Sequence, residues 1–152
     1  YDAALKDATE KSVAESSTCS LVVLDIDDFK RINDNFGHQV GDKILKFIAS
    51  TLGKNVRGND ILARYGGEEF AIILPETNFE GAMRVAENLR KAVAARQLTT
   101  GSNGKVIGRI TASIGVSCFR HSEPLDSFFD RVDKLMYQAK QAGKDRVIGE
   151  AD

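Results

Sequence analysis

Hydrophobic residues recur along this 152-residue chain with two different periods. Apolar runs or strict alternation predict β-strands over Ser20–Ile26, Ile61–Tyr65, Glu69–Leu74, Arg109–Phe119 and Arg146–Ile148. Apolar residues at i, i+3 and i+4 predict helices over residues 1–16, 28–36, 42–53, 77–93 and 124–139. Strands and helices therefore alternate along most of the sequence.

Capping and turn residues set the predicted ends of these elements. Gly37 is typical of the end of a helix, and Asp42 is a good N-cap for the next one. Thr77-Asn78-Phe79-Glu80 has the spacing of a capping box. Gly66-Gly67 predicts a tight turn between two strands, and Ser102-Asn103-Gly104 predicts the turn of a second, small hairpin.

The predicted order is strand, two helices, hairpin, helix, strand, helix, strand. It contains a βαββαβ unit, which is the ferredoxin-like arrangement. We therefore expect an α+β fold in which helices cover a largely antiparallel sheet. The length indicates one domain, and a chain of this size buries roughly 68–70% of its unfolded surface without disulfides or a structural metal.

Composition narrows the class of protein. Hydrophobic residues make up 42% and charged residues 28%, as in ordinary globular domains. The net charge of −1 argues against a broadly basic surface, so we predict no DNA or RNA binding. No apolar run reaches the roughly 18–20 residues of a membrane span. Cys19 and Cys118 form neither a disulfide framework nor a zinc site, which favours the reducing cytoplasm.

Two acidic clusters carry the candidate chemistry. Asp25-Ile26-Asp27-Asp28 ends the first strand, and Glu68-Glu69 follows the Gly66-Gly67 turn. Neighbouring carboxylates repel one another, and Mg²⁺ favours one or two carboxylates together with substrate phosphates. The alternative is that these charges are simply solvated at strand ends and that the glycines form an ordinary hairpin turn.

Three sequence blocks resemble the GGDEF family, the diguanylate cyclases. They are Arg64-Tyr65-Gly66-Gly67-Glu68-Glu69-Phe70, a GGEEF form of the signature, the stretch from Asp25 to Asp42, and Ala139-Lys140 with Gly143–Val147. The resemblance extends from about Ser20 to Val147, with the blocks in the family's order. It implies the palm-type fold of nucleotidyl cyclases and condensation of two GTP into cyclic di-GMP and two pyrophosphates, using Mg²⁺ or Mn²⁺.

The resemblance also assigns roles to individual residues. It places metal ligands at Asp25, Ile26 through its carbonyl, Glu68 and Glu69. Glu68 matches the residue also assigned as the base, and Lys30 matches a cation that stabilises the transition state. Because a carboxylate bound to Mg²⁺ is a weak base, the assignment of Glu68 as base stays open.

Contacts to GTP come from the same resemblance. The phosphates are expected at the backbone N–H groups of Asp28 and Phe29, at Gly66 and Gly67, and at Lys140 and Lys144. Asn33 and Asp42 match the guanine-reading residues, and His38 matches a further substrate contact. The alternatives are that Asn33 is a solvated helix residue and that Asp42 only caps a helix.

A fourth short pattern indicates regulation. Arg57-Gly58-Asn59-Asp60 has the R-x-x-D form at the offset from the signature of the family's inhibitory site. Arginine and aspartate suit the edge of a guanine base, so we expect cyclic di-GMP to bind at Arg57 and Asp60. The alternative is a surface loop with two opposite charges.

The assembly of the whole protein is a further expectation. The family usually begins with a Leu-Thr-Gly-Leu-x-Asn-Arg segment that this sequence lacks, so we expect residues 1–152 to be one domain of a longer regulatory protein. That protein would carry an N-terminal sensor or receiver domain and act as a cytoplasmic or inner-membrane-anchored homodimer. The main alternative function is an inactive GGDEF domain that senses cyclic di-GMP or GTP; an adenylyl cyclase or an interaction domain is less compatible with these motifs.

Overall fold

A five-stranded sheet forms the centre of the protein. The computed structural model describes residues 2–100 and 104–151. The strand order is β2-β3-β1-β6-β7, with the bounds β1 Cys19–Ile26, β2 Ile61–Arg64, β3 Glu69–Pro75, β6 Ala112–Cys118 and β7 Arg146–Glu150. All neighbours are antiparallel except β6 and β7. The order β6-β1-β3-β2 confirms the predicted ferredoxin-like core, and β7 extends it at one edge.

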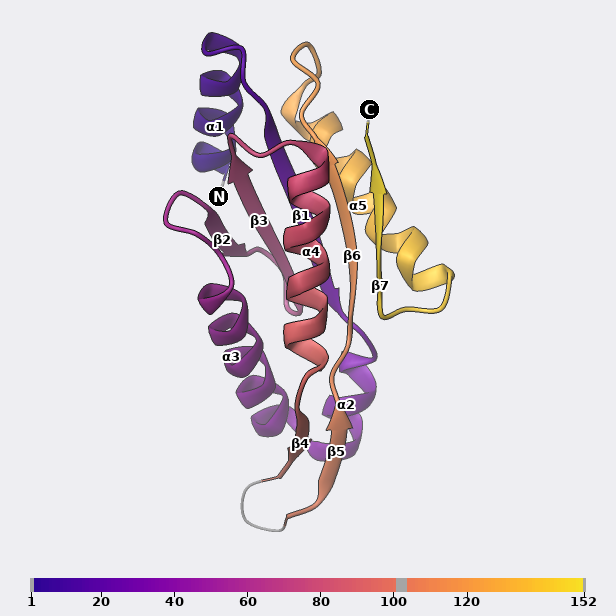
Figure 1. Ribbon diagram of the computed structural model, residues 1–152. Helices are drawn as coiled ribbons and strands as arrows, with labels where there is room; N and C mark the ends of the chain where they lie inside the picture. The colour runs from indigo at the N-terminus through magenta and orange to yellow at the C-terminus, as the bar shows by residue number, and fades with distance from the viewer. Residues whose placement is uncertain (1, 101–103, 152) are drawn as a thin grey trace.

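Helices cover both faces of the sheet, so the α+β prediction is confirmed (Figure 1). Their bounds are α1 Asp2–Ala14, α2 Phe29–Phe36, α3 His38–Lys54, α4 Phe79–Ala94 and α5 Leu125–Gln141. Val22 and Leu24 of β1 pack with α2, α3 and α4, whereas Leu21 and Val23 pack with α1 and α5. The period-two pattern of β1 thus supplies both cores. None of the helices in the described ranges has the length and apolar character to cross a membrane.

Two predicted helix starts are wrong. α3 begins at His38, with Gly37 as its N-cap at a φ of 89°, so Asp42 lies inside the helix and is not its cap. The N-cap of α4 is Asn78, whose side chain accepts a hydrogen bond from the Gly81 N–H at 2.8 Å. Asn is at least as good an N-cap as Thr, which explains why Thr77 and Glu80 do not form the expected capping box.

The predicted strand over Arg109–Phe119 is two strands. β5 (Val106–Arg109) pairs with β4 (Gln97–Thr99) in a separate two-stranded sheet, and β6 begins only at Ala112. Ile110 lies between them and is 3% exposed, so the apolar alternation continues through a change of direction. The small hairpin is confirmed, although Ser102 and Asn103 of its predicted turn lie outside the described residues.

Helix α5 lies close against β6 because of a glycine. A Cβ at Gly115 would stand 2.3 Å from the Val132 carbonyl oxygen and 2.5 Å from the Met136 nitrogen. No larger residue fits without moving the helix backbone. This close packing fixes the position of α5, whose last turn carries Lys140 to the end of β1.

Candidate active site

The Gly66-Gly67 turn lies beside the end of β1. Asp25 is the cross-strand partner of Glu69, and the Ile26 N–H donates to the Glu68 carbonyl oxygen at 3.2 Å. A Cβ at Gly66 would lie 2.9 Å from Glu69 Oε2, so the turn approaches this carboxylate closely. The structure therefore brings together the two acidic clusters that the sequence separates.

Burial changes the proton affinity of these carboxyls. Asp25 is 6% exposed, and its burial raises its pKa to about 6; Lys140 lowers this pKa and Glu69 raises it further. Burial and the neighbouring Asp25 also raise the pKa of Glu68. The ionised forms thus destabilise one another, and a cation placed among them would relieve that repulsion.

Lys140 supplies one positive charge at this position. Its Nζ lies 2.8 Å from Asp25 Oδ1, 3.2 Å from Asp27 Oδ1 and 3.4 Å from the Ile26 carbonyl oxygen. Burial lowers the pKa of Lys140, but the contacts with Asp25 and Asp27 outweigh it and the pKa is raised. Lys140 therefore stays charged and faces the predicted metal ligands.

Asp27 has a different environment from Asp25. Its Oδ1 accepts from the Ser113 hydroxyl at 2.7 Å, and its Oδ2 accepts from the Thr111 hydroxyl at 2.8 Å and the Asp145 N–H at 3.0 Å. These bonds tie the end of β1 to β6 and to the segment before β7. Asp27 therefore has a structural role, to which no sequence motif pointed.

The donor set fits a hard divalent cation. Within residues 2–100 and 104–151, no three His, Cys, Asp or Glu side chains are already grouped as a metal site. Asp25 and the Ile26 carbonyl nevertheless offer oxygen ligands that share a contact with Lys140, and the charge of Asp25 acts on the nearby Glu68. Mg²⁺ needs only one or two carboxylates when phosphates complete its shell. The site thus has the ligand chemistry of a cation that binds together with a nucleotide.

The predicted phosphate-binding residues surround the start of α2. Asp28 precedes the helix at a φ of 57°, and Lys144 Nζ lies 2.6 Å from Asp28 Oδ1, which lowers the pKa of Asp28. Phe29 is the first residue of α2 and is buried. Lys30 is exposed and has no ion pair in the described part of the chain, so the structure leaves it outside the Asp25 cluster.

The predicted guanine readers lie where α2 meets α3. A Cβ at Gly41 would stand 1.8 Å from Asn33 Oδ1, so the Asn33 amide lies directly against the residue before Asp42. Asn33 Oδ1 is buried and has no hydrogen-bond partner among the described residues. Buried acceptors are rarely left unsatisfied, which makes the amide a candidate for a ligand contact. Asp42 and His38 are exposed on α3.

The R-x-x-D pattern forms a compact turn beside α4. Asp60 Oδ2 accepts from the Arg57 N–H at 2.9 Å, and the Asp60 N–H donates to the Arg57 carbonyl at 3.0 Å. Arg57 and Asp60 line a pocket of about 560 Å³ with Arg84 and Asn88 of α4. Sequence reasoning missed these last two residues; their i, i+4 spacing on a helix was the only available signal.

Helix α5 carries two ionisable residues whose pKa values respond to the charge of the acidic cluster, and sequence reasoning also missed these. Burial raises the pKa of Asp133, as do the charges of Asp130 and Asp25. The negative charge of Asp133 raises the pKa of Tyr137, and that of Glu69 raises it to a smaller extent. Asp133, Tyr137 and Lys140 have i, i+4, i+7 spacing and therefore lie along one stripe of α5, of which Lys140 contacts the acidic cluster directly.

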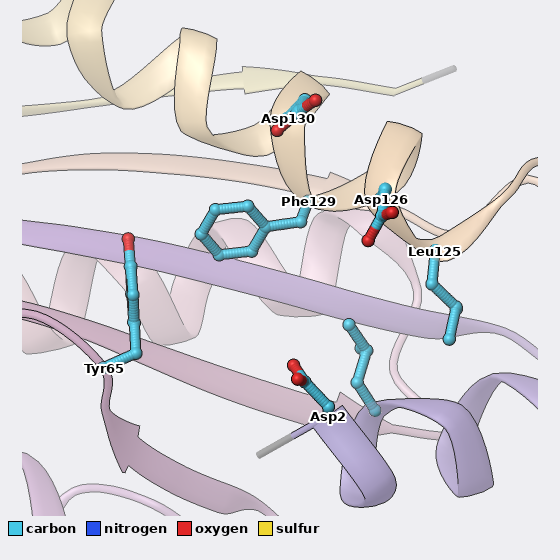
Figure 2. A pocket seen from close by; sticks show the side chains of 7 residues that line it. Asp2, Tyr65, Leu125, Asp126, Phe129 and Asp130 are labelled. Carbon is cyan, nitrogen blue, oxygen red and sulfur yellow. The ribbon is translucent and has the colours of Figure 1, made fainter.

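A separate pocket of about 600 Å³ lies between α1 and the start of α5 (Figure 2). Its lining comprises Asp2, Leu5, Tyr65, Leu125, Asp126, Phe129 and Asp130. The rings of Tyr65 and Phe129 meet edge to face, with centroids 5.1 Å apart. None of the predicted site residues lines this pocket, so the predicted nucleotide site is elsewhere.

The domain family described as "Diguanylate cyclase, GGDEF domain" matches residues 1–146. The diguanylate cyclase DgcP of Pseudomonas aeruginosa is 44% identical over 149 residues, which are 95% of this chain but only 22% of DgcP.

Solved structures show the same relationship. The GGDEF domain of DgcB from Caulobacter crescentus, in complex with c-di-GMP, superposes with a TM-score of 0.92 at 36% identity, covering 95% of this chain and 82% of that one. The active GGEEF domain of a Vibrio cholerae diguanylate cyclase gives a TM-score of 0.87 at 31% identity, covering 97% and 92%.

Proposed function

Because the chain belongs to the GGDEF family of diguanylate cyclases, we propose that it condenses two molecules of GTP into cyclic di-GMP. In each half-reaction the 3′-hydroxyl of one GTP attacks the α-phosphorus of the other, a new P–O bond forms, and the bond to pyrophosphate breaks. The observation that carries the proposal is the convergence of Asp25, Glu68 and Glu69 at the end of β1 beside Lys140. Phosphoryl transfer depends mostly on such positioning and charge neutralisation.

The acidic residues and the lysines have complementary roles in this proposal. Asp25, the Ile26 carbonyl, Glu68 and Glu69 would hold Mg²⁺ or Mn²⁺, which would supply charge neutralisation and lower the pKa of the attacking hydroxyl. Lys140 and Lys144 bind the terminal phosphates, beside the N–H groups of Asp28 and Phe29 and the open Gly66-Gly67 turn. Lys30 reaches the phosphates from the first turn of α2 and stabilises the developing negative charge.

The guanine base binds at the α2–α3 corner. Asn33 offers an amide whose oxygen has no partner in the described part of the chain, and Asp42 accepts from the base N–H groups. His38 lies at the start of the same helix and contacts the substrate. Adenine lacks the matching donors, so ATP would leave these polar groups unpaired and is discriminated against.

Each domain holds one GTP in this proposal, so two domains must face each other as a symmetric homodimer. Regulatory domains N-terminal to this one would control that pairing and would place the whole protein in the cytoplasm or at the inner membrane. The chain spans only 22% of DgcP, so DgcP itself is long enough to contain further domains.

Product analysis tests the proposed activity. The domain at high concentration is incubated with Mg²⁺ and either GTP or ATP, and the nucleotides are separated by chromatography. Cyclic di-GMP is expected from GTP alone, and Glu68→Gln is expected to abolish it. A domain fused to a dimeric partner serves as the control for failed pairing. If that fusion also makes no cyclic di-GMP, the activity is overturned and the sensor alternative takes its place.

We also propose that cyclic di-GMP inhibits the enzyme at the pocket of Arg57, Asp60, Arg84 and Asn88. Added cyclic di-GMP is expected to slow wild-type turnover, and Arg57→Ala is expected to relieve this inhibition. Arg120→Ala is the matched control, because Arg120 pairs with Glu150 and does not line this pocket. Equal inhibition of all three proteins would remove the proposed inhibitory site.

A further inference from the structure

Lys140 contacts two of the oxygen atoms that the proposed function assigns to a metal ion as ligands. Its Nζ lies 2.8 Å from Asp25 Oδ1 and 3.4 Å from the Ile26 carbonyl oxygen. Mg²⁺ binds its ligands at about 2.0–2.1 Å. A dication on these oxygens and the ammonium group in its present position would therefore repel each other at close range.

We infer that Lys140 is an exchangeable counter-cation of the metal site. In the nucleotide-free domain its ammonium neutralises Asp25, and it leaves Asp25 when a divalent cation and a nucleotide bind together. The inference rests on the proposed function, because the nucleotide's phosphates supply the ammonium with a partner that replaces Asp25. It concerns the contact that Lys140 makes before the nucleotide arrives.

The contacts of Lys140 allow this exchange. Asp27, its other carboxylate partner, also accepts from the Thr111 and Ser113 hydroxyls and the Asp145 N–H. Departure of Lys140 therefore leaves no unpaired carboxylate at Asp27. The Lys140 side chain is 22% exposed, so its ammonium is already near the surface of the site.

Asp25 depends more strongly on Lys140. Within residues 2–100 and 104–151 its only ion pair is with Lys140, and its carboxyl also contacts that of Glu69. Asp25 therefore needs one cation, either the ammonium group or a metal ion. A cation that arrives without nucleotide must displace Lys140 from this carboxylate, whereas nucleotide phosphates attract the ammonium away from it. Cation and nucleotide affinities consequently raise each other, by the same factor in both directions.

A titration with Mn²⁺ in the absence of nucleotide tests this inference. Binding is followed by electron paramagnetic resonance in the wild-type domain and in the Lys140→Met, Lys140→Arg and Lys144→Met variants. Met keeps the length of the side chain and removes its charge. Lys140→Met is expected to bind Mn²⁺ about tenfold more tightly than wild type. Arg keeps the competing charge, and Lys144 pairs with Asp28 rather than Asp25, so neither control gains affinity.

The sign of the change separates exchange from structural damage, because a distorted site would bind Mn²⁺ more weakly. Unchanged or weaker binding by Lys140→Met overturns the inference, as does an equal gain in Lys144→Met. Adding Asp25→Asn to Lys140→Met must remove the tightened binding. If no variant binds Mn²⁺ in a way that depends on Asp25, the proposed metal site is overturned as well. The proposed activity is tested independently, by the chromatographic analysis of cyclic di-GMP. Lys140→Gln replaces Lys140→Met should circular dichroism show that the latter is unfolded.

Discussion

Two buried aspartates lie two residues apart at the end of β1, and they differ in the hydrogen bonds that their carboxylates accept. Asp27 accepts two hydroxyl groups and a backbone N–H from distant parts of the chain. Asp25 faces an ammonium group on one side and the carboxyl of Glu69 on the other. Their exposures are similar, 4% and 6%. Burial alone therefore does not distinguish a structural carboxylate from a functional one, whereas the set of hydrogen-bond donors does.

The difference has an energetic reason. A buried carboxylate that accepts several hydrogen bonds stabilises its ionised form within the fold. One that meets another carboxyl and a single lysine keeps acceptor capacity for a further cation. Residues held in such incompletely satisfied surroundings are common at functional sites. Replacing each aspartate in turn tests whether the contrast is real.

Asp25→Asn should give the largest effect on activity. It removes the central carboxylate of the proposed metal site, and we expect a loss of about 10²–10³-fold or more in cyclic di-GMP formation. The free energy of unfolding should stay equal or rise, because burial disfavours the ionised Asp25 carboxylate and Lys140 keeps its contact with Asp27. Chromatographic assays and urea titrations measure the two quantities. A variant that is active, or one that is clearly destabilised, would contradict the role given to Asp25.

Asp27→Asn should instead reduce stability. The new amide NH₂ group faces the Asp145 N–H or the Lys140 ammonium, both of which only donate, so at least one contact becomes unfavourable. We expect the free energy of unfolding to fall by about 3 kcal/mol. Urea unfolding followed by circular dichroism measures this value. A fully stable variant with no activity would reverse the roles of the two aspartates.

The sequence predicted the functional role of Asp25 but not the structural role of Asp27. Asp25 and Glu68 stood at a strand end and beside a turn, and the family resemblance gave them roles. The partners of Asp27 are Thr111, Ser113 and Asp145, which lie far away in sequence, and no local pattern reports such contacts. Arg84 and Asn88 were not predicted as pocket residues for the same reason, since only folding brings α4 beside Arg57. The start of α4 was missed because Thr77 and Asn78 are both acceptable caps. The start of α3 was missed because Gly37 both ends α2 and caps α3, with no other residue between the two helices.

The pH dependence of stability should differ between wild type and Asp25→Asn. The pKa of Asp25 is raised from 3.8 to about 6 by folding, so the folded state binds this proton more tightly than the unfolded state. The resulting stabilisation is complete below pH 3.8 and is lost as the pH rises through 6. Asp25→Asn does not lose this stabilisation. Its free energy of unfolding, relative to that of wild type, should therefore increase by at most about 3 kcal/mol as the pH rises from 3.8 through 6. Urea unfolding in EDTA measures the difference, and a constant difference would contradict it.

The smallest expected effect extends the comparison to Asn33, whose buried amide oxygen has no hydrogen-bond partner within residues 2–100 and 104–151. Gly41→Ala would place a Cβ 1.8 Å from this oxygen, so the amide must move. If the amide reads guanine, the KM for GTP should rise about tenfold, which corresponds to one misplaced hydrogen bond. The Gly53→Ala control, a helical glycine with open space around it, should leave KM unchanged. Measuring KM and unfolding in parallel separates the two explanations: a stability loss with an unchanged KM would mean that Asn33 only packs α2 against α3.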